Sequence, residues 1–329
     1  MRGALRLLVA VGLLAAMPAA LAAFTSGSNT SGTVATAPDW TGPTATASVI
    51  AKQTGYLAGA VKPGGVYYIY ANVTDNGNPA AGVSTVRADV NNVTATQTNV
   101  TMTAGSYSIN GVPYAYRSSS TLTAGAGLSP GSKTFTINST DVLGYPGSQS
   151  FSVTVDNSAP SASDIQTTNK VGGTSGVAES GDTITFTYSE QIDPQSILAG
   201  WTGASTNVVV RLEDGGCVLN LLVKLCGDDS FEVYNGASPL ATLGPVNLKD
   251  PDYLGGGLLG AVPDAVFAST MVQSGASIVI TLGTRSGSSA DSGNSTTMEW
   301  NSATSPYDAA GNAATGNLRN ETGGGDREF

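Results

Sequence analysis

Histidine is missing from this chain of 329 residues, and cysteine and charged side chains, which enzymes also use, are scarce. The lack of histidine excludes Ser-His-Asp and Cys-His catalysis, and it excludes zinc or iron held by imidazole. No glycine-rich loop of the phosphate-binding form is present either. Charged residues make up only 12% of the sequence, and the net charge is −10 at pH 7. Nucleic acid and anionic membranes are therefore poor partners for this chain.

Long hydrophobic runs are also lacking beyond the first residues of the chain. There, Arg2 and Arg6 begin an apolar stretch that ends in the small-residue sequence Ala20-Leu-Ala22. The stretch is shorter than the ~20 residues that span a bilayer, so we predict a signal peptide over residues 1–22, cleaved between Ala22 and Ala23. Its removal leaves 12 basic residues against 24 acidic ones, a net charge of about −12. We expect a secreted protein, free or associated with the cell envelope, with no membrane span after cleavage.

Cysteine occurs only twice, as Cys217 and Cys226. In a secreted chain such a pair indicates a disulfide, yet the apolar residues between them would also suit one buried strand. A straight strand would separate the two Cα atoms by ~30 Å, whereas a disulfide needs roughly 4.4–6.8 Å. We therefore predict a hairpin that turns between Asn220 and Val223 and is closed by the Cys217–Cys226 disulfide. The spacing is not Cys-x-x-Cys, so redox catalysis is not expected.

The abundant residues are those of β-sheet proteins. The chain holds 42 glycines and 15 prolines, and its apolar residues alternate with a period of two. Its length suits two domains with separate cores, and we place the boundary at the X-Pro junction before Pro160. The predicted strands are 45–51, 66–74, 83–90, 114–123, 133–139 and 148–155 in the first domain, and 183–188, 207–213, 231–234, 265–272, 277–282 and 295–300 in the second.

Two segments carry a resemblance to a known family. The first, Gly181–Ile197, places Ile184, Phe186 and Tyr188 on one face of a strand before an Asp-Pro turn; the second is Tyr307–Thr315. Together they resemble the first and last parts of a bacterial Ig-like domain of secreted and surface proteins. The resemblance implies two tandem Ig-like β-sandwich domains after an N-terminal signal peptide. The predicted divisions are an exposed lead-in over 23–43, sandwiches over 44–157 and 158–318, the latter with long insertions, and a polar tail over 319–329.

An Asp-x-x-Gly element occurs near the end of each predicted domain, at Asp141–Gly144 and at Asp308–Gly311. In the Ig-like family this element is a turn in which the carboxylate accepts backbone N–H groups and the glycine takes a positive φ. A catalytic aspartate is the alternative interpretation of each. The segment from Ala23 to Trp40 is also similar to the start of many actinobacterial secreted Ig-like proteins.

Carboxylates are the remaining groups that could support catalysis, because a glycosidase needs only two of them at a suitable separation. We expect these side chains to be solvated at strand ends and in turns, and we predict no catalytic residue. The candidates are Glu190, Asp193, Glu213, Asp228, Asp229 and Glu232.

Calcium is the metal that this composition would suit. Asp156-Asn157 at the domain junction resembles the linkers of calcium-binding cadherin repeats, and Asp75, Asn76 and Asp141 offer further oxygen ligands. No loop of regularly spaced ligands accompanies them. We therefore predict no metal site and no cofactor, and an ordinary turn at the junction.

Tyrosines offer a second possible binding surface. Tyr67 must face away from Tyr68 and Tyr70 on a shared strand, because neighbouring residues point to opposite sides. One set fills the core, and the other could stack on sugar rings or on a protein partner. Further tyrosines lie at positions 107, 114 and 116.

These observations favour a non-catalytic protein that acts as a spacer, an adhesin or a matrix component. Its expected partner is a protein or glycan of the cell envelope or extracellular matrix. The alternative is a carbohydrate-binding module or a carboxylate-only glycoside hydrolase. A flat aromatic strip, or two carboxylates facing each other across a cleft, would favour that alternative.

Overall fold

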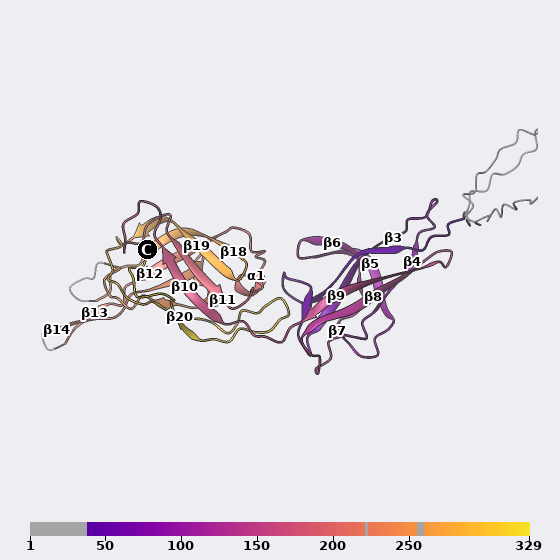
Figure 1. Cartoon of the computed structure of the whole chain (residues 1–329). Helices are drawn as coiled ribbons and strands as arrows, with labels where there is room; N and C mark the ends of the chain where they lie inside the picture. Colours follow the sequence, from indigo (N-terminus) through magenta and orange to yellow (C-terminus); the bar gives the residue numbers. More distant parts are fainter. Residues whose placement is uncertain (1–37, 221–222, 255–259) are drawn as a thin grey trace, which may run out of the picture. The chain divides into compact units, whose positions relative to one another are not determined.

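The computed structural model describes residues 38–220, 223–254 and 260–329 (Figure 1). The predicted signal peptide, its cleavage site at Ala22 and Ala23, and the lead-in as far as residue 37 lie outside the described residues. Within the described ranges the regular structure is β-sheet apart from one short helix, α1 (Pro194–Ile197). The all-β prediction is confirmed. This one helix of the described ranges is not long and apolar enough to cross a membrane.

The first sheet contains nine strands and nearly closes on itself. Its order is β1-β3-β6-β5-β4-β8-β9-β2, with β7 paired to β3, and the pairing is antiparallel except between β2 and β9. The two ends of this path meet, because β1 contacts both β2 and β9. The strands are β1 (Thr44–Lys52), β2 (Ala60–Val61), β3 (Val66–Thr74), β4 (Val83–Asp89), β5 (Val100–Ile109), β6 (Val112–Ser118), β7 (Leu122–Thr123), β8 (Gly131–Asp141) and β9 (Pro146–Val155).

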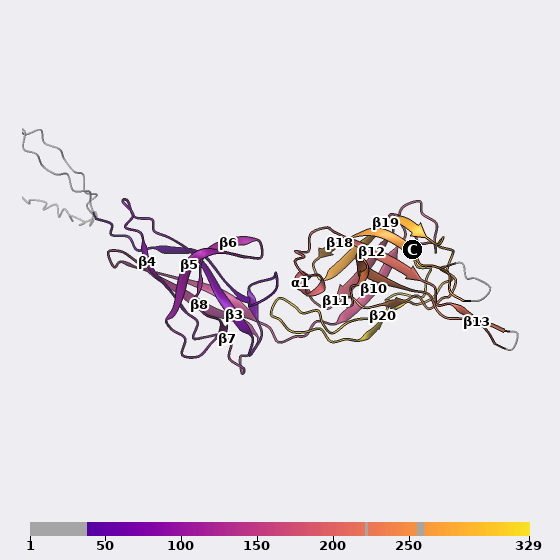
Figure 2. The ribbon, with the colours of Figure 1, turned by 180° about the vertical axis from the view of Figure 1, so that it is seen from behind.

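The second sheet contains ten strands in the order β10-β11-β19-β18-β12-β15-β17-β20-β21, with β16 paired to β15. Its outermost strands, β10 and β21, contact each other, so this sheet is also nearly barrel-shaped. Figure 2 shows β10, β11 and β20 of this sheet from behind. The strands are β10 (Ala162–Thr168), β11 (Thr183–Tyr188), β12 (Thr206–Glu213), β15 (Ser230–Asn235), β16 (Ser238–Pro239), β17 (Val246–Asn247), β18 (Ala265–Ser274), β19 (Ser277–Gly287), β20 (Glu299–Asn301) and β21 (Leu318–Asn320).

Alternation along the strands explains the two hydrophobic cores. In β11, Ile184, Phe186 and Tyr188 are buried while the intervening threonines are partly exposed, as predicted. Trp300 lies at the centre of the second core, where its ring stands edge-on to Phe186 and to Tyr188 at centroid distances of 5.1 Å. Its Nε1 donates a hydrogen bond to the carbonyl oxygen of Leu243 at 2.7 Å. The core of the first sheet forms a separate cluster.

The disulfide between Cys217 and Cys226 is present and closes the predicted hairpin. Strands β13 (Cys217–Asn220) and β14 (Val223–Cys226) pair with each other in a separate two-stranded sheet. Its apolar side chains are not buried, since four of them are 50–64% exposed. They are Val218, Leu219, Val223 and Leu225.

The segment predicted as a polar tail contributes to the second sheet. Strand β21 pairs with β20, and the aromatic ring of Phe329 is buried against Phe231 and Tyr253. The architecture is thus two large, nearly barrel-shaped sheets and a disulfide-closed hairpin. The two Ig-like sandwiches over 44–157 and 158–318 remain a prediction.

Candidate functional site at the junction of the two sheets

The Asp-Pro sequence after β11 begins helix α1. Asp193 is the N-cap, and its carboxylate accepts a hydrogen bond from the backbone N–H of Gln195 at 3.0 Å. Pro194 suits the first helical turn, because a residue there needs no N–H donor and its φ is already helical. The hydroxyl of Ser196 donates to the carbonyl oxygen of Asp193 at 2.6 Å. The cap is therefore held in a fixed orientation.

Asp193 forms a buried ion pair with Lys52, the last residue of β1. The Lys52 Nζ lies 2.5 Å from Asp193 Oδ2, and the two residues are 8% and 0% exposed. Asp193 Oδ2 also accepts the backbone N–H groups of Tyr56 and Leu57, each at 2.9 Å. The Lys52 ammonium donates further to the carbonyl oxygens of Leu57 at 3.1 Å and Ala309 at 3.0 Å. Burial lowers the pKa of Lys52, and the charge of Asp193 opposes that change.

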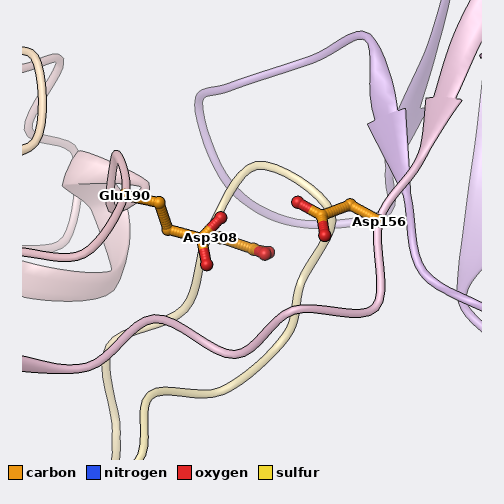
Figure 3. A group of neighbouring side chains, drawn as sticks. All are labelled: Asp156, Glu190 and Asp308. Carbon is orange, nitrogen blue, oxygen red and sulfur yellow. The ribbon is translucent and has the colours of Figure 1, made fainter. Parts of the chain in front are cut away.

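Three more carboxylates meet beside this pair. Asp156 follows β9, Glu190 follows β11, and Asp308 lies in the loop before β21. Each offers an oxygen atom, and the three atoms lie within 4.8 Å of one another (Figure 3). Hard cations such as Ca²⁺ prefer oxygen ligands of this kind, so the three residues could hold one.

The Asp308 carboxylate stabilises a turn, and one of its oxygen atoms is used for that purpose. Its Oδ1 accepts the backbone N–H groups of Gly311 at 2.6 Å and Asn312 at 2.8 Å, and Gly311 has a φ of 91°. Asp141 repeats this turn: its Oδ1 accepts the N–H four positions on at 2.7 Å, and Gly144 has a φ of 93°. Both Asp-x-x-Gly elements therefore form the turn that the family resemblance implies.

Glu190 is the member of the group whose protonation is most perturbed. Burial, with the negative charges of Asp156 and Asp308, raises the pKa of Glu190 to about 7. A carboxyl group in this state can carry a proton near neutral pH, which is a property of general acids. A cavity of about 240 Å³ lies nearby, and its lining includes Lys52, Tyr307 and Gly311.

The other predicted carboxylates do not join this group. Glu213 accepts a hydrogen bond from the Tyr234 hydroxyl at 3.0 Å, and Glu232 lies opposite Arg211 in the sheet register. Asp228 is exposed.

Asp229, although it was expected to be solvated, is buried. It accepts backbone N–H groups from Gly215 at 3.1 Å and Leu254 at 2.8 Å, and burial raises its pKa to about 6. The expectation was wrong for Asp229 because its carboxylate folds inward to satisfy two loop amides. It was also wrong for Asp193, which is 0% exposed because it pairs with Lys52.

The other oxygen ligands considered for calcium are also placed apart from the junction. Asp75 accepts the backbone N–H of Gly82 at 2.6 Å. Among the described residues, no group of three acidic side chains within 4.8 Å of one another includes Asp75 or Asp141. Asp156 therefore lies with Glu190 and Asp308, and not with Asp75 or Asp141.

The tyrosines divide between two faces as predicted. Tyr67 lies in the core of the first sheet, and Arg117 lies over the rings of Tyr68 and Tyr107 on the opposite face, at 4.3 and 4.6 Å from their centroids. The rings of Tyr70 and Tyr114 are buried there and tilted toward one another. This cluster is therefore packed against itself and is not a flat exposed strip.

Sequence reasoning missed Lys52, because a lysine at a strand end looks like any surface lysine. It also missed a second acidic group, formed by Glu321, Asp326 and Glu328. These three lie in the segment predicted as a polar tail, where acidic residues are expected to be solvated. Only the tertiary fold shows that two of them are buried.

Comparison with known proteins gives little guidance. No family model matches the sequence, and no curated protein matches it. A solved structure, dimeric latent PorU from Porphyromonas gingivalis, is similar over 76% of this chain with 16% identity and a TM-score of 0.24. This chain spans 20% of the PorU chain. At that TM-score the likeness carries no argument.

Proposed function

We propose that this chain is a non-catalytic structural protein with two Ig-like modules that works outside the cell or at its envelope. Its role is that of a spacer, an adhesin or a matrix component, and its partner is a protein or glycan of the envelope or matrix. The absence of histidine and the low content of charged residues support this class of function.

The observation that carries the proposal is the Lys52–Asp193 ion pair. A buried pair contributes little net stability, because desolvation of the two ions offsets most of their attraction. The pair instead fixes the orientation of the two segments that carry it, because separating them would leave a buried charge without its partner, which costs free energy. The pair connects the end of β1, in the first sheet, to the cap of α1, which follows β11 of the second sheet. A spacer or adhesin needs such a fixed relation between modules, so that binding loops stay in place.

The proposal is tested by co-sedimentation of the purified secreted protein with envelope and matrix fractions of the producing cell. We expect the labelled protein to appear in the pellet. An excess of the same protein without the label should displace it. A Lys52→Met variant, in which the orientation of the modules is loosened, should bind more weakly. The matched control is Lys133→Met, which removes a lysine from β8 that forms no ion pair in the described structure. Failure of the wild-type protein to associate with either fraction would refute the proposal.

A carboxylate-only glycoside hydrolase is the second candidate, because Glu190 has a raised pKa and lies close to Asp156. Retaining glycosidases hold two carboxyl groups about 5–5.5 Å apart, one as acid and the other as nucleophile. This candidate predicts turnover of a polysaccharide by the wild-type protein and its loss in both Glu190→Gln and Asp156→Asn. Asp228→Asn is the matched control. Equal activity of the wild type and the three variants would exclude the hydrolase.

A further inference from the structure

The segment 321–329 is bound to the second sheet by its own backbone. The N–H of Glu321 donates to the carbonyl oxygen of Met298 at 3.1 Å, and the N–H of Thr296 donates to the carbonyl oxygen of Asp326 at 2.9 Å. Further along, the N–H of Glu328 donates to the Tyr253 hydroxyl at 2.8 Å. The three acidic side chains of this segment are therefore held in definite places.

These three carboxylates converge. Glu321, Asp326 and Glu328 each offer an oxygen atom, and the three atoms lie within 4.8 Å of one another. Glu321 and Glu328 are buried, with 8% and 0% of their surface exposed, and Asp326 is exposed. In the described part of the chain, no lysine or arginine forms an ion pair with any of them.

Glu328 adds an independent sign that a ligand is needed. Its Oε2 accepts a hydrogen bond from the Thr167 hydroxyl at 2.7 Å, but its buried Oε1 has no hydrogen-bond partner. A buried carboxylate oxygen without a partner costs free energy, and native proteins almost always satisfy such atoms. Two neighbouring carboxylates increase that cost by repulsion.

We propose that Glu321, Asp326 and Glu328 form a calcium site that fastens the segment 321–329 to the second sheet. Calcium takes 6–8 oxygen ligands in flexible geometry, including carboxylates and water. The exposed Asp326 leaves the site open on one side, where water can complete the coordination. Magnesium suits this site less well, because it demands near-ideal octahedral geometry and gives up its own waters reluctantly.

A proton is the competing way to neutralise the cluster. Burial, with the negative charge of Glu321, raises the pKa of Glu328 to about 8. A proton shared by Glu328 and Glu321 would remove part of the repulsion without any metal. The two explanations differ in one measurable respect, since only the first requires calcium to bind here.

The test is isothermal titration of calcium chloride into the EDTA-treated, full-length secreted protein. We expect calcium to bind, and Glu328→Gln and Asp326→Asn each to raise the Kd by at least about tenfold. Asp228→Asn, an exposed acidic residue outside the cluster, is the matched control and should leave the Kd unchanged. In hydrogen exchange, calcium should slow the amides of residues 318–329 in the wild-type protein and not in Asp326→Asn.

Three results would overturn the proposal. Absence of calcium binding by the wild-type protein would assign the cluster to a shared proton. Binding that persists in both Glu328→Gln and Asp326→Asn would place the ion elsewhere, and loss of binding in Glu190→Gln alone would place it at the junction. If Glu328→Gln fails to fold, Asp326→Asn still decides, because this side chain is exposed and its replacement disturbs no buried contact.

Discussion

Lys52 and Asp193 lie 141 positions apart in the sequence, yet they form a buried ion pair with an Nζ–Oδ2 distance of 2.5 Å. Backbone N–H groups supply the other partners of the carboxylate, so the charge of Asp193 is compensated from several directions. Removing the lysine alone leaves this carboxylate buried without its counter-ion.

Lys52→Met should therefore destabilise the protein by about 3 kcal/mol, the lower end of what breaking a buried pair costs, because the amides still stabilise Asp193. Urea unfolding followed by circular dichroism measures the change. Lys52→Met/Asp193→Asn should be less destabilised than the sum of the two single variants, since no buried charge is left alone. Additive effects of the two substitutions would contradict the interpretation of the pair.

Glu190 gives a pH dependence whose sign is fixed by its pKa. The pKa of Glu190 is raised to about 7 in the folded protein, so between its usual value and pH 7 the folded state binds the proton more tightly than the unfolded state. The stability that this residue contributes is present at low pH and is lost as the pH rises toward 7. Glu190→Gln should therefore raise the Tm more at pH 8 than at pH 5. An equal change at both values would contradict the prediction, and Asp228→Asn is the control.

Trp300 is fully buried and donates its indole N–H to Leu243, whereas Trp40 is 69% exposed. Trp300→Phe removes the donor and leaves a cavity, so we expect a loss of about 2–4 kcal/mol. Trp40→Phe is the matched control and should change stability by less than ~0.5 kcal/mol. Denaturant unfolding of the two variants should differ clearly, and similar midpoints would count against the described core.

Replacing both Cys217 and Cys226 by serine should act locally. The chain-entropy model gives a disulfide of this span on the order of 2–3 kcal/mol. Because β13 and β14 form a sheet of their own, we expect faster hydrogen exchange in these two strands and little change in the exchange of β12 and β18. Loss of protection throughout the second sheet would show that the hairpin is coupled to its core.

Local patterns could be predicted from the sequence, and contacts between distant segments could not. The strands 66–74 and 183–188 were predicted with the bounds that the structure has, because β11 alternates apolar and polar residues and β3 is a run rich in valine, isoleucine and tyrosine, which favour strands. Strands β5 and β10 were missed, since Thr, Gly and Ser interrupt the apolar residues of β5, and only Ala162 and Ile165 of β10 are apolar. Their pairing depends on neighbouring strands and not on their own composition.

The candidate sites follow the same division. The Asp-x-x-Gly turns are local. The backbone N–H groups that Asp308 and Asp141 accept lie within four residues of each aspartate, so these roles could be inferred from the sequence. The meeting of Asp308 with Glu190 and Asp156 depends on the relation between separate loops. A single sequence contains no signal for that meeting, because solvated and clustered carboxylates look alike in it.

The hairpin of β13 and β14 has a further consequence, for solubility. In both large sheets the end strands contact each other, which protects most backbone N–H and C=O groups from pairing with another molecule. Among the described residues no strand pairs with the outer edge of β14, and Val223 and Leu225 on that strand are exposed. At high protein concentration this edge is the place where two copies would begin to aggregate. A charged residue on this edge, as in Leu225→Lys, would oppose pairing between copies and delay precipitation, and it would leave both cores unchanged.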